Sequence, residues 1–87
     1  GTEGIRGGVF DLTGDARACA TTPYESVFPQ PGWAEQRPED WWESLGQSVR
    51  RAVQSAGIRP SDVAAIAVDT TCCSVVALDS AGRPLRP

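Results

Sequence analysis

The chain has 87 residues, a net charge of −3, 40% hydrophobic residues and 22% charged residues, which suits one small domain or part of one. Its mild acidity and scattered basic residues argue against a nucleic-acid-binding protein. It has no apolar run near the roughly 20 residues of a membrane span, and no signal-peptide pattern. We therefore expect neither nucleic acid nor a membrane as a partner.

The chain contains three cysteines and no histidine. The odd count and the adjacency of Cys72 and Cys73 argue against a secreted disulfide framework, so we expect a cytoplasmic location. Two adjacent thiols without a second pair make a poor zinc site, so no metal site is assigned. Without histidine, a Ser or Cys nucleophile lacks its usual partner, which argues against acyl-transfer hydrolysis. Cys19 is expected to be a small buried hydrophobic residue.

The first half of the chain predicts a hairpin and then a loop. Residues 5–26 hold two runs of strand-forming residues around turn chemistry at Thr13-Gly14-Asp15, which predicts a β-hairpin with its tip at Gly14. Residues 28–33 are too rich in proline to join a sheet ladder. They are expected to form a connecting loop with aromatic anchors.

A helix is predicted from Pro38 to Gly57. Proline is favourable at a first helical position, Glu39 and Asp40 lie near the positive end, and glycine suits the end of a helix. One face at helical spacing carries the apolar residues that we expect to pack: Trp42, Leu45, Val49, Ala52, Val53 and Ala56. The three tryptophans of the chain, Trp33, Trp41 and Trp42, are expected to be packing anchors rather than sugar-stacking platforms.

After the helix, an apolar run at Ala64–Val68 stops at Asp69 and opens into a polar loop that ends at Ser74. The run predicts a strand buried on both faces, and ligands collect at the carboxyl ends of such strands. The same residues also fit a plain loop. Val75–Leu78 predicts another short strand, followed by a turn at residues 79–82. The order of elements is that of an α/β piece rather than a bundle or a sandwich.

Several motifs in fixed order resemble the start of the FGGY family of carbohydrate kinases. The resemblance covers essentially the whole chain. The loop Asp69–Val75 is similar to the ribulokinase and the plant or cyanobacterial D-ribulose kinase branch, whereas glycerol kinases carry an Arg-Glu pair in place of Cys72-Cys73. The motifs are Gly1–Arg6 (GTEGIR), Val9–Asp11 (VFD), Pro31–Gln36 (PGWAEQ), Pro38–Trp42 (PEDWW) and Gly82–Pro87 (GRPLRP).

The resemblance implies a partial ribonuclease H-like domain of the actin and sugar kinase superfamily that lacks its first, central strand. Residues 1–87 would then be a fragment of the kinase N-terminal domain, truncated at both ends, with the remaining kinase domains in the full-length chain. The implied chemistry is transfer of the γ-phosphoryl group of ATP, with Mg²⁺, to a hydroxyl of a ketopentose, with D-ribulose as the first expectation. The catalytic base would lie in the absent C-terminal part, so the fragment itself is expected to be inactive. A homo-oligomer remains open.

Site residues follow from the same resemblance. A Gly-Thr turn beside the phosphates offers backbone amides and a hydroxyl to an anion, whereas the carboxylate of Glu3 would repel phosphate unless it faces away or meets the metal. The residues implied to bind the ATP phosphates are Gly1, Thr2, Gly4 and Arg6, and those implied to bind the sugar are Asp69, Thr71, Cys72 and Cys73.

Two alternatives stay open at this point. One is a kinase for another sugar or polyol, such as L-ribulose, ribitol or xylulose. The other is a non-catalytic module of the same superfamily that binds a nucleotide or a protein partner. A piece this small has little core to oppose chain entropy, so we expect the chain alone to be marginally stable or prone to aggregation.

Overall fold

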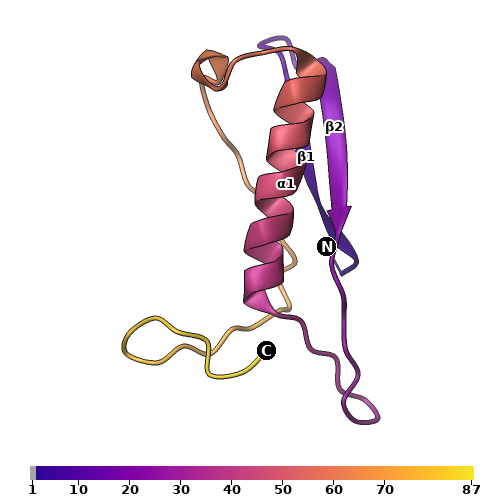
Figure 1. Cartoon of the computed structure of the whole chain (residues 1–87), viewed down its shortest axis with the longest axis vertical. Helices are drawn as coiled ribbons and strands as arrows, with labels where there is room; N and C mark the ends of the chain where they lie inside the picture. The colour runs from indigo at the N-terminus through magenta and orange to yellow at the C-terminus, as the bar shows by residue number, and fades with distance from the viewer. Residues whose placement is uncertain (1) are drawn as a thin grey trace.

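The computed structural model describes residues 2–87, so the phosphate role implied for Gly1 lies outside the described residues. Its elements are β1 (Gly4–Phe10), β2 (Ala16–Pro23), α1 (Pro38–Ala56) and a short 3₁₀ helix, η1 (Pro60–Asp62). Helix α1 lies along one face of the β1–β2 hairpin, with its axis following the strands (Figure 1). The expectation of an α/β piece is confirmed.

The hairpin forms as predicted, with an antiparallel register that pairs Gly4 with Pro23 and Gly7 with Ala20. Its tip is an Asp11–Asp15 turn in which the Asp11 carboxylate accepts hydrogen bonds from the backbone amides of Thr13 (2.9 Å) and Asp15 (3.0 Å). Gly14 has a φ of 91°, which disfavours a residue with a side chain. Local turn chemistry therefore fixes the hairpin.

Helix α1 begins and ends where the sequence predicts. Pro38 occupies its first turn and Gly57 ends it with a φ of 66°. The Gly57 amide donates to the Gln54 carbonyl at 3.1 Å, and the Ile58 amide donates to the Val53 carbonyl at 3.4 Å. Glycine tolerates this left-handed conformation, which supplies partners for the last carbonyls of the helix.

The seam between α1 and the hairpin is made of small and polar residues. Ser44, Ser48 and Ala52, four residues apart, are buried there. A Cβ built on Gly7 would lie 3.0 Å from the backbone of Ser48, so the helix approaches β1 as closely as a glycine permits. Ser48 is fully buried, and its hydroxyl is hydrogen-bonded to the Ile5 carbonyl (2.9 Å) and to the Thr22 hydroxyl (2.8 Å).

The prediction for the packed face of the helix was wrong in part. Ala52 is buried, but Trp42 is 78% exposed and Val49 is also exposed. The close approach at Gly7 leaves room only for small side chains, so the stripe of Ser44, Ser48 and Ala52 faces the hairpin and the large apolar residues lie beside it. Cys19 is likewise exposed, because it lies on the hairpin face opposite α1.

The strand predicted at Ala64–Val68 is absent from residues 2–87. This segment runs from η1 along an extended course (Figure 1), with Ile66 85% exposed and Val68 78% exposed. A strand needs a neighbouring strand for its backbone hydrogen bonds. None of the described residues pairs with this segment, so its apolar, β-branched composition alone does not make a strand.

The strand predicted at Val75–Leu78 is also wrong, although its turn is present. Leu78 and Pro84 form an isolated antiparallel bridge, and the Leu85 amide donates to the Ala77 carbonyl at 2.9 Å. The turn repeats the geometry of the first hairpin. The Asp79 carboxylate accepts hydrogen bonds from the backbone amides of Ala81 and Arg83, two and four residues further along the chain, and Gly82 has a φ of 76°. A turn without enough paired residues leaves a bridge instead of a strand.

None of the helices within residues 2–87 combines the length and the apolarity that a membrane crossing needs.

Candidate functional site

The turn that precedes β1 is held in place through the carbonyl oxygen of Thr2. This oxygen accepts hydrogen bonds from Gln36 Nε2 at 3.1 Å and from Ser26 Oγ at 3.3 Å. Gln36 Nε2 also donates to Ser26 Oγ at 2.7 Å. Two segments that are distant in sequence thus hold the start of the chain, while the side chain of Thr2 stays exposed.

Gln36 connects this turn to helix α1. Its Oε1 accepts a hydrogen bond from Trp41 Nε1 at 3.1 Å, and the Trp41 ring lies 6.5 Å from the Tyr24 ring, tilted by 58°. Both ends of the Gln36 amide are therefore used, the donor toward Thr2 and the acceptor toward Trp41. Sequence analysis gave this residue no part in the candidate site, because its contacts depend on segments brought together by the fold.

Gly4 and Arg6 lie at the start of β1, but their surroundings differ. A Cβ on Gly4 would lie 2.8 Å from the Thr22 carbonyl oxygen, so a residue with a side chain does not fit there. Arg6 lies on the hairpin face opposite α1, paired with Thr21, and is exposed. Among residues 2–87 it has no ion-pair partner, so its guanidinium is available to an anion.

Glu3 adds a carboxylate next to this turn. Its side chain is exposed, and its backbone carbonyl accepts a hydrogen bond from the Tyr24 amide at 3.4 Å. An exposed carboxylate is free to face away from an anion near this turn. This part of the chain therefore offers the Thr2 hydroxyl and the Arg6 guanidinium, which suit a phosphate, and the Glu3 carboxylate, which does not.

Sequence analysis assigns no metal site, and Mg²⁺ is implied by the family resemblance alone. Across residues 2–87, no three His, Cys, Asp or Glu side chains gather in a way that could hold a metal ion. Magnesium is bound by carboxylates together with phosphate oxygens and water. A magnesium ion held by one or two carboxylates and by phosphate oxygens does not need such a cluster, so no step of a reaction is assigned to the metal.

The loop implied to bind the sugar lies in the exposed segment after Val68. Asp69, Cys72 and Cys73 are exposed, and Thr71 is half-buried. Asp69 makes no hydrogen bond or ion pair within the described part of the chain, while the sulfur atoms of Cys72 and Cys73 lie 3.6 Å apart. No hydrogen bond or ion pair within residues 2–87 joins this loop to the turn at Thr2, so the structure does not assemble the two groups into one site.

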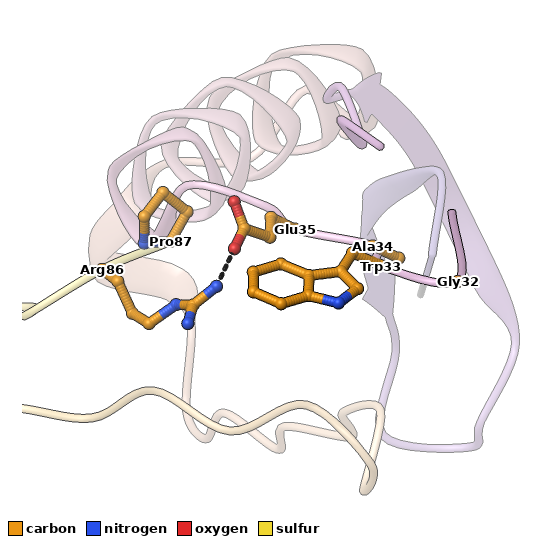
Figure 2. Close-up of a pocket in the computed structure, with 6 residues that line it drawn as sticks. All are labelled: Gly32, Trp33, Ala34, Glu35, Arg86 and Pro87. Carbon is orange, nitrogen blue, oxygen red and sulfur yellow. Dashed lines mark hydrogen bonds and ion pairs between the residues drawn. The ribbon is translucent and has the colours of Figure 1, made fainter. Parts of the chain in front are cut away.

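A second polar cluster, which sequence analysis did not predict, ties the chain's last residues to the loop between β2 and α1. Figure 2 shows Arg86 paired with the Glu35 carboxylate, and its guanidinium lies 5.0 Å from the centre of the Trp33 ring. These residues line an open pocket of about 260 Å³ together with Gly32, Ala34 and Pro87. Glu35 and Arg86 are 51 residues apart, so no local pattern indicates the pair.

Three turn carboxylates have a lowered pKa. The Thr13 hydroxyl, then the Asp15 amide and the Arg17 guanidinium hold the pKa of Asp11 well below its ordinary value. The Arg59 side chain and backbone lower the pKa of Asp62. The Arg83 amide, followed by its side chain, lowers the pKa of Asp79. The charged forms of these groups stabilise turns rather than the candidate site.

Comparison with known proteins identifies the family of the chain. The family model for the FGGY family of carbohydrate kinases, N-terminal domain, matches residues 1–87. The chain belongs to this family. The resemblance drawn from the sequence motifs is confirmed.

Individual relatives in this family carry two different names. Over 98% of its length the chain is 35% identical to a ribulokinase from Geobacillus thermodenitrificans and 33% identical to glycerol kinase 2 from Thermotoga maritima. A glycerol kinase from Methylibium petroleiphilum is 37% identical, again over 98% of the chain. The chain spans about 17% of the length of these relatives. Overall identity does not separate the two kinds of kinase for this FGGY family member.

Proposed function

We propose that the full-length protein is an ATP-dependent carbohydrate kinase that transfers the γ-phosphoryl group to a hydroxyl of a ketopentose, D-ribulose first. The observation that carries this proposal is the match of the FGGY N-terminal domain family to all 87 residues. The preference for a ketopentose rests on the loop Asp69–Val75, where Cys72 and Cys73 replace the Arg-Glu pair of glycerol kinases. Residues 1–87 would be part of its N-terminal domain and inactive alone.

The roles follow the resemblance. Thr2 and Gly4, together with Gly1, would approach the ATP phosphates. The guanidinium of Arg6, which has no ion-pair partner within residues 2–87, would meet their charge. Asp69 and Thr71 would bind sugar hydroxyls, with Cys72 and Cys73 leaving room for the carbon chain. Mg²⁺ would be held with residues beyond this chain, and it neutralises phosphate charge when bound. The chain's own residues would bind and orient the two substrates.

We also propose the finer points of fold and location. The hairpin and helix would be part of a ribonuclease H-like domain of the actin and sugar kinase superfamily, and the other kinase domains would complete the cleft. Three free cysteines suit a reducing cytoplasm. Both points rest on the family resemblance and on composition.

The substrate is tested with the full-length protein, ATP, Mg²⁺ and a panel of D-ribulose, L-ribulose, D-xylulose, ribitol and glycerol, with ADP release as the readout. We expect D-ribulose to give the highest kcat/KM. A site built around a hydroxyl strongly rejects an analogue that lacks it, so the preference is measurable. Absence of ADP release with every acceptor of the panel would favour an untested sugar or the non-catalytic alternative.

Glycerol is the second candidate, because relatives named glycerol kinase are 33% and 37% identical to the chain. A preference for glycerol would overturn the substrate assigned from Cys72 and Cys73 while keeping the kinase. A double substitution tests whether these two residues determine the substrate: replacement of Cys72 and Cys73 by the Arg-Glu pair should lower kcat/KM for D-ribulose relative to that for glycerol.

The proposed phosphate turn is tested through Gln36 rather than through the turn itself. Gln36→Glu removes the donor that the Thr2 carbonyl accepts at 3.1 Å and places a carboxylate beside it, while Trp41 keeps an acceptor. We expect KM for ATP to rise several-fold with KM for the sugar nearly unchanged. Gln30→Glu makes the same change of charge at an exposed loop position and serves as the control. Equal KM values for ATP in both variants would remove the turn from the proposed site.

A further inference from the structure

The adjacent thiols Cys72 and Cys73 form a two-sulfur cluster with the geometry of a chelating ligand. Both side chains are exposed, and their sulfur atoms lie 3.6 Å apart. Within residues 2–87, neither sulfur has another hydrogen-bond partner. The pair therefore faces solvent with its two sulfurs directed to a common region.

The separation of the two sulfurs allows both of them to bond to one thiophilic atom. With two bonds of about 2.3 Å, the length of a zinc–thiolate bond, sulfurs 3.6 Å apart subtend an angle of about 103° at the bound atom. That angle is close to those of tetrahedral and pyramidal centres. An ion that binds two sulfurs in a line would need them much farther apart.

A direct disulfide fits the pair less well than an inserted atom. Consecutive Cα atoms lie about 3.8 Å apart across a trans peptide bond, which is below the range of about 4.4–6.8 Å for disulfide-bridged residues. The sulfurs would also have to close from 3.6 Å to about 2.05 Å. An inserted atom keeps them near their present separation.

The number of donors selects the class of ligand. Structural zinc takes four protein ligands, and no group of three or more candidate ligands exists among residues 2–87. A monosubstituted trivalent arsenical has two exchangeable positions and a pyramidal centre, so two thiols satisfy it. We propose that Cys72 and Cys73 form a dithiol site for trivalent, thiophilic metalloids.

The binding step is a condensation without a change of oxidation state. An arsenoxide, R–As=O, reacts with the two thiols to form two As–S bonds, and the oxygen leaves as one water molecule with both thiol protons. No oxidant or reductant is needed. Because the thiols are neighbours in the chain, closing the ring costs little conformational entropy.

The test uses the reduced full-length protein with phenylarsine oxide and intact-mass spectrometry. We expect one phenylarsenic group in place of two thiol hydrogens, stable to a large excess of a monothiol and removed by a small dithiol. Cys72→Ser and Cys73→Ser should each lose the monothiol-resistant group, whereas Cys19→Ser should keep it. A resistant group that survives in either single variant, or one that a monothiol removes from the unaltered protein, would overturn the site.

A link between this dithiol site and catalysis rests on the proposed function, and it is measured separately from arsenical binding. If the loop binds sugar, saturating D-ribulose should slow the loading of the arsenical, and loading should abolish ADP release until a dithiol is added. Loading that is indifferent to every sugar would count against the sugar role of the loop. It would leave the dithiol site established by the mass measurement, so the two failures are distinguishable.

Discussion

Replacement of Gly7 by alanine should weaken the packing of helix α1 against the hairpin. A Cβ at Gly7 would lie 3.0 Å from the carbonyl carbon and oxygen of Ser48 and from the amide nitrogen of Val49. All three are backbone atoms in the middle of a helix, so no flexible side chain can move aside. Unstrained carbon contacts lie at about 3.5–4.0 Å, so the helix must shift by about half an ångström or more.

The expected cost follows from two opposing effects. Overpacking of a close contact destabilises by about 1–3 kcal/mol. Alanine also restricts the unfolded chain, which stabilises by about 0.4–1 kcal/mol wherever the native backbone allows a side chain. Gly7 does not have a positive φ, so that gain applies. The net loss for Gly7→Ala should be about 1–2 kcal/mol.

Gly8→Ala is the matched control, because it changes the next residue of the same strand. A Cβ there would lie 2.8 Å from the tip of the Phe10 ring, a side chain that is 61% exposed and can turn away. Amide hydrogen exchange of β1 and β2 in the full-length protein reports the opening of the hairpin. We expect exchange about tenfold faster for Gly7→Ala and nearly unchanged for Gly8→Ala. If Gly8→Ala were the more damaging variant, the close approach of helix and strand would be refuted.

Two further predictions concern the seam and the first turn. Ser48→Ala should destabilise by about 1–3 kcal/mol, because it removes a buried hydroxyl with two partners. Ser44→Ala should cost less, since its one hydrogen bond is long at 3.4 Å; equal losses in denaturant unfolding would contradict this. The hairpin turn should weaken in acid: the lowered pKa of Asp11 gives stability that is full above the unfolded value of about 3.9 and lost as pH falls toward the folded pKa. Asp11→Asn should remove this pH dependence from the NMR shifts of the hairpin, and Asp69→Asn should preserve it.

The elements that the sequence predicts correctly are those fixed by local chemistry. The Asp11–Asp15 turn and the flanking strand residues determine the hairpin, and Pro38 and Gly57 determine the limits of the helix. The small-residue stripe was also visible in the sequence, as Ser44, Ser48 and Ala52 at a spacing of four. Ranking residues by hydrophobicity hid it, because the helix packs by close approach instead of by large apolar side chains.

The features that the sequence does not predict depend on contacts between distant segments. Gln36 and Thr2 are 34 residues apart, and their hydrogen bond exists only because the loop returns to the start of β1. At Ala64–Val68 the composition favours a strand, but a strand forms only where a second segment pairs with it. Local propensity does not report whether such a second segment lies beside these residues in the fold. The loop Asp69–Ser74 was predicted to lie at the carboxyl end of that strand, so its predicted position is lost together with the strand.

The stability of the isolated chain follows from what its seam buries. Of the hydrophobic residues among residues 2–87, Ala52 alone is fully buried, while Trp42, Ile66, Val68 and Val75 are all more than three-quarters exposed. Burial of one such large side chain contributes about 1.5–3 kcal/mol, a large part of the stability of a small domain. The exposed side chains named above do not make this contribution. Residues 1–87 alone should therefore unfold without a sharp transition, or aggregate, when heated at low concentration. The measurements are circular dichroism with light scattering across a dilution series. A cooperative melt of a dilute monomer would show that polar contacts in the seam, led by Ser48, suffice to hold the helix on the hairpin.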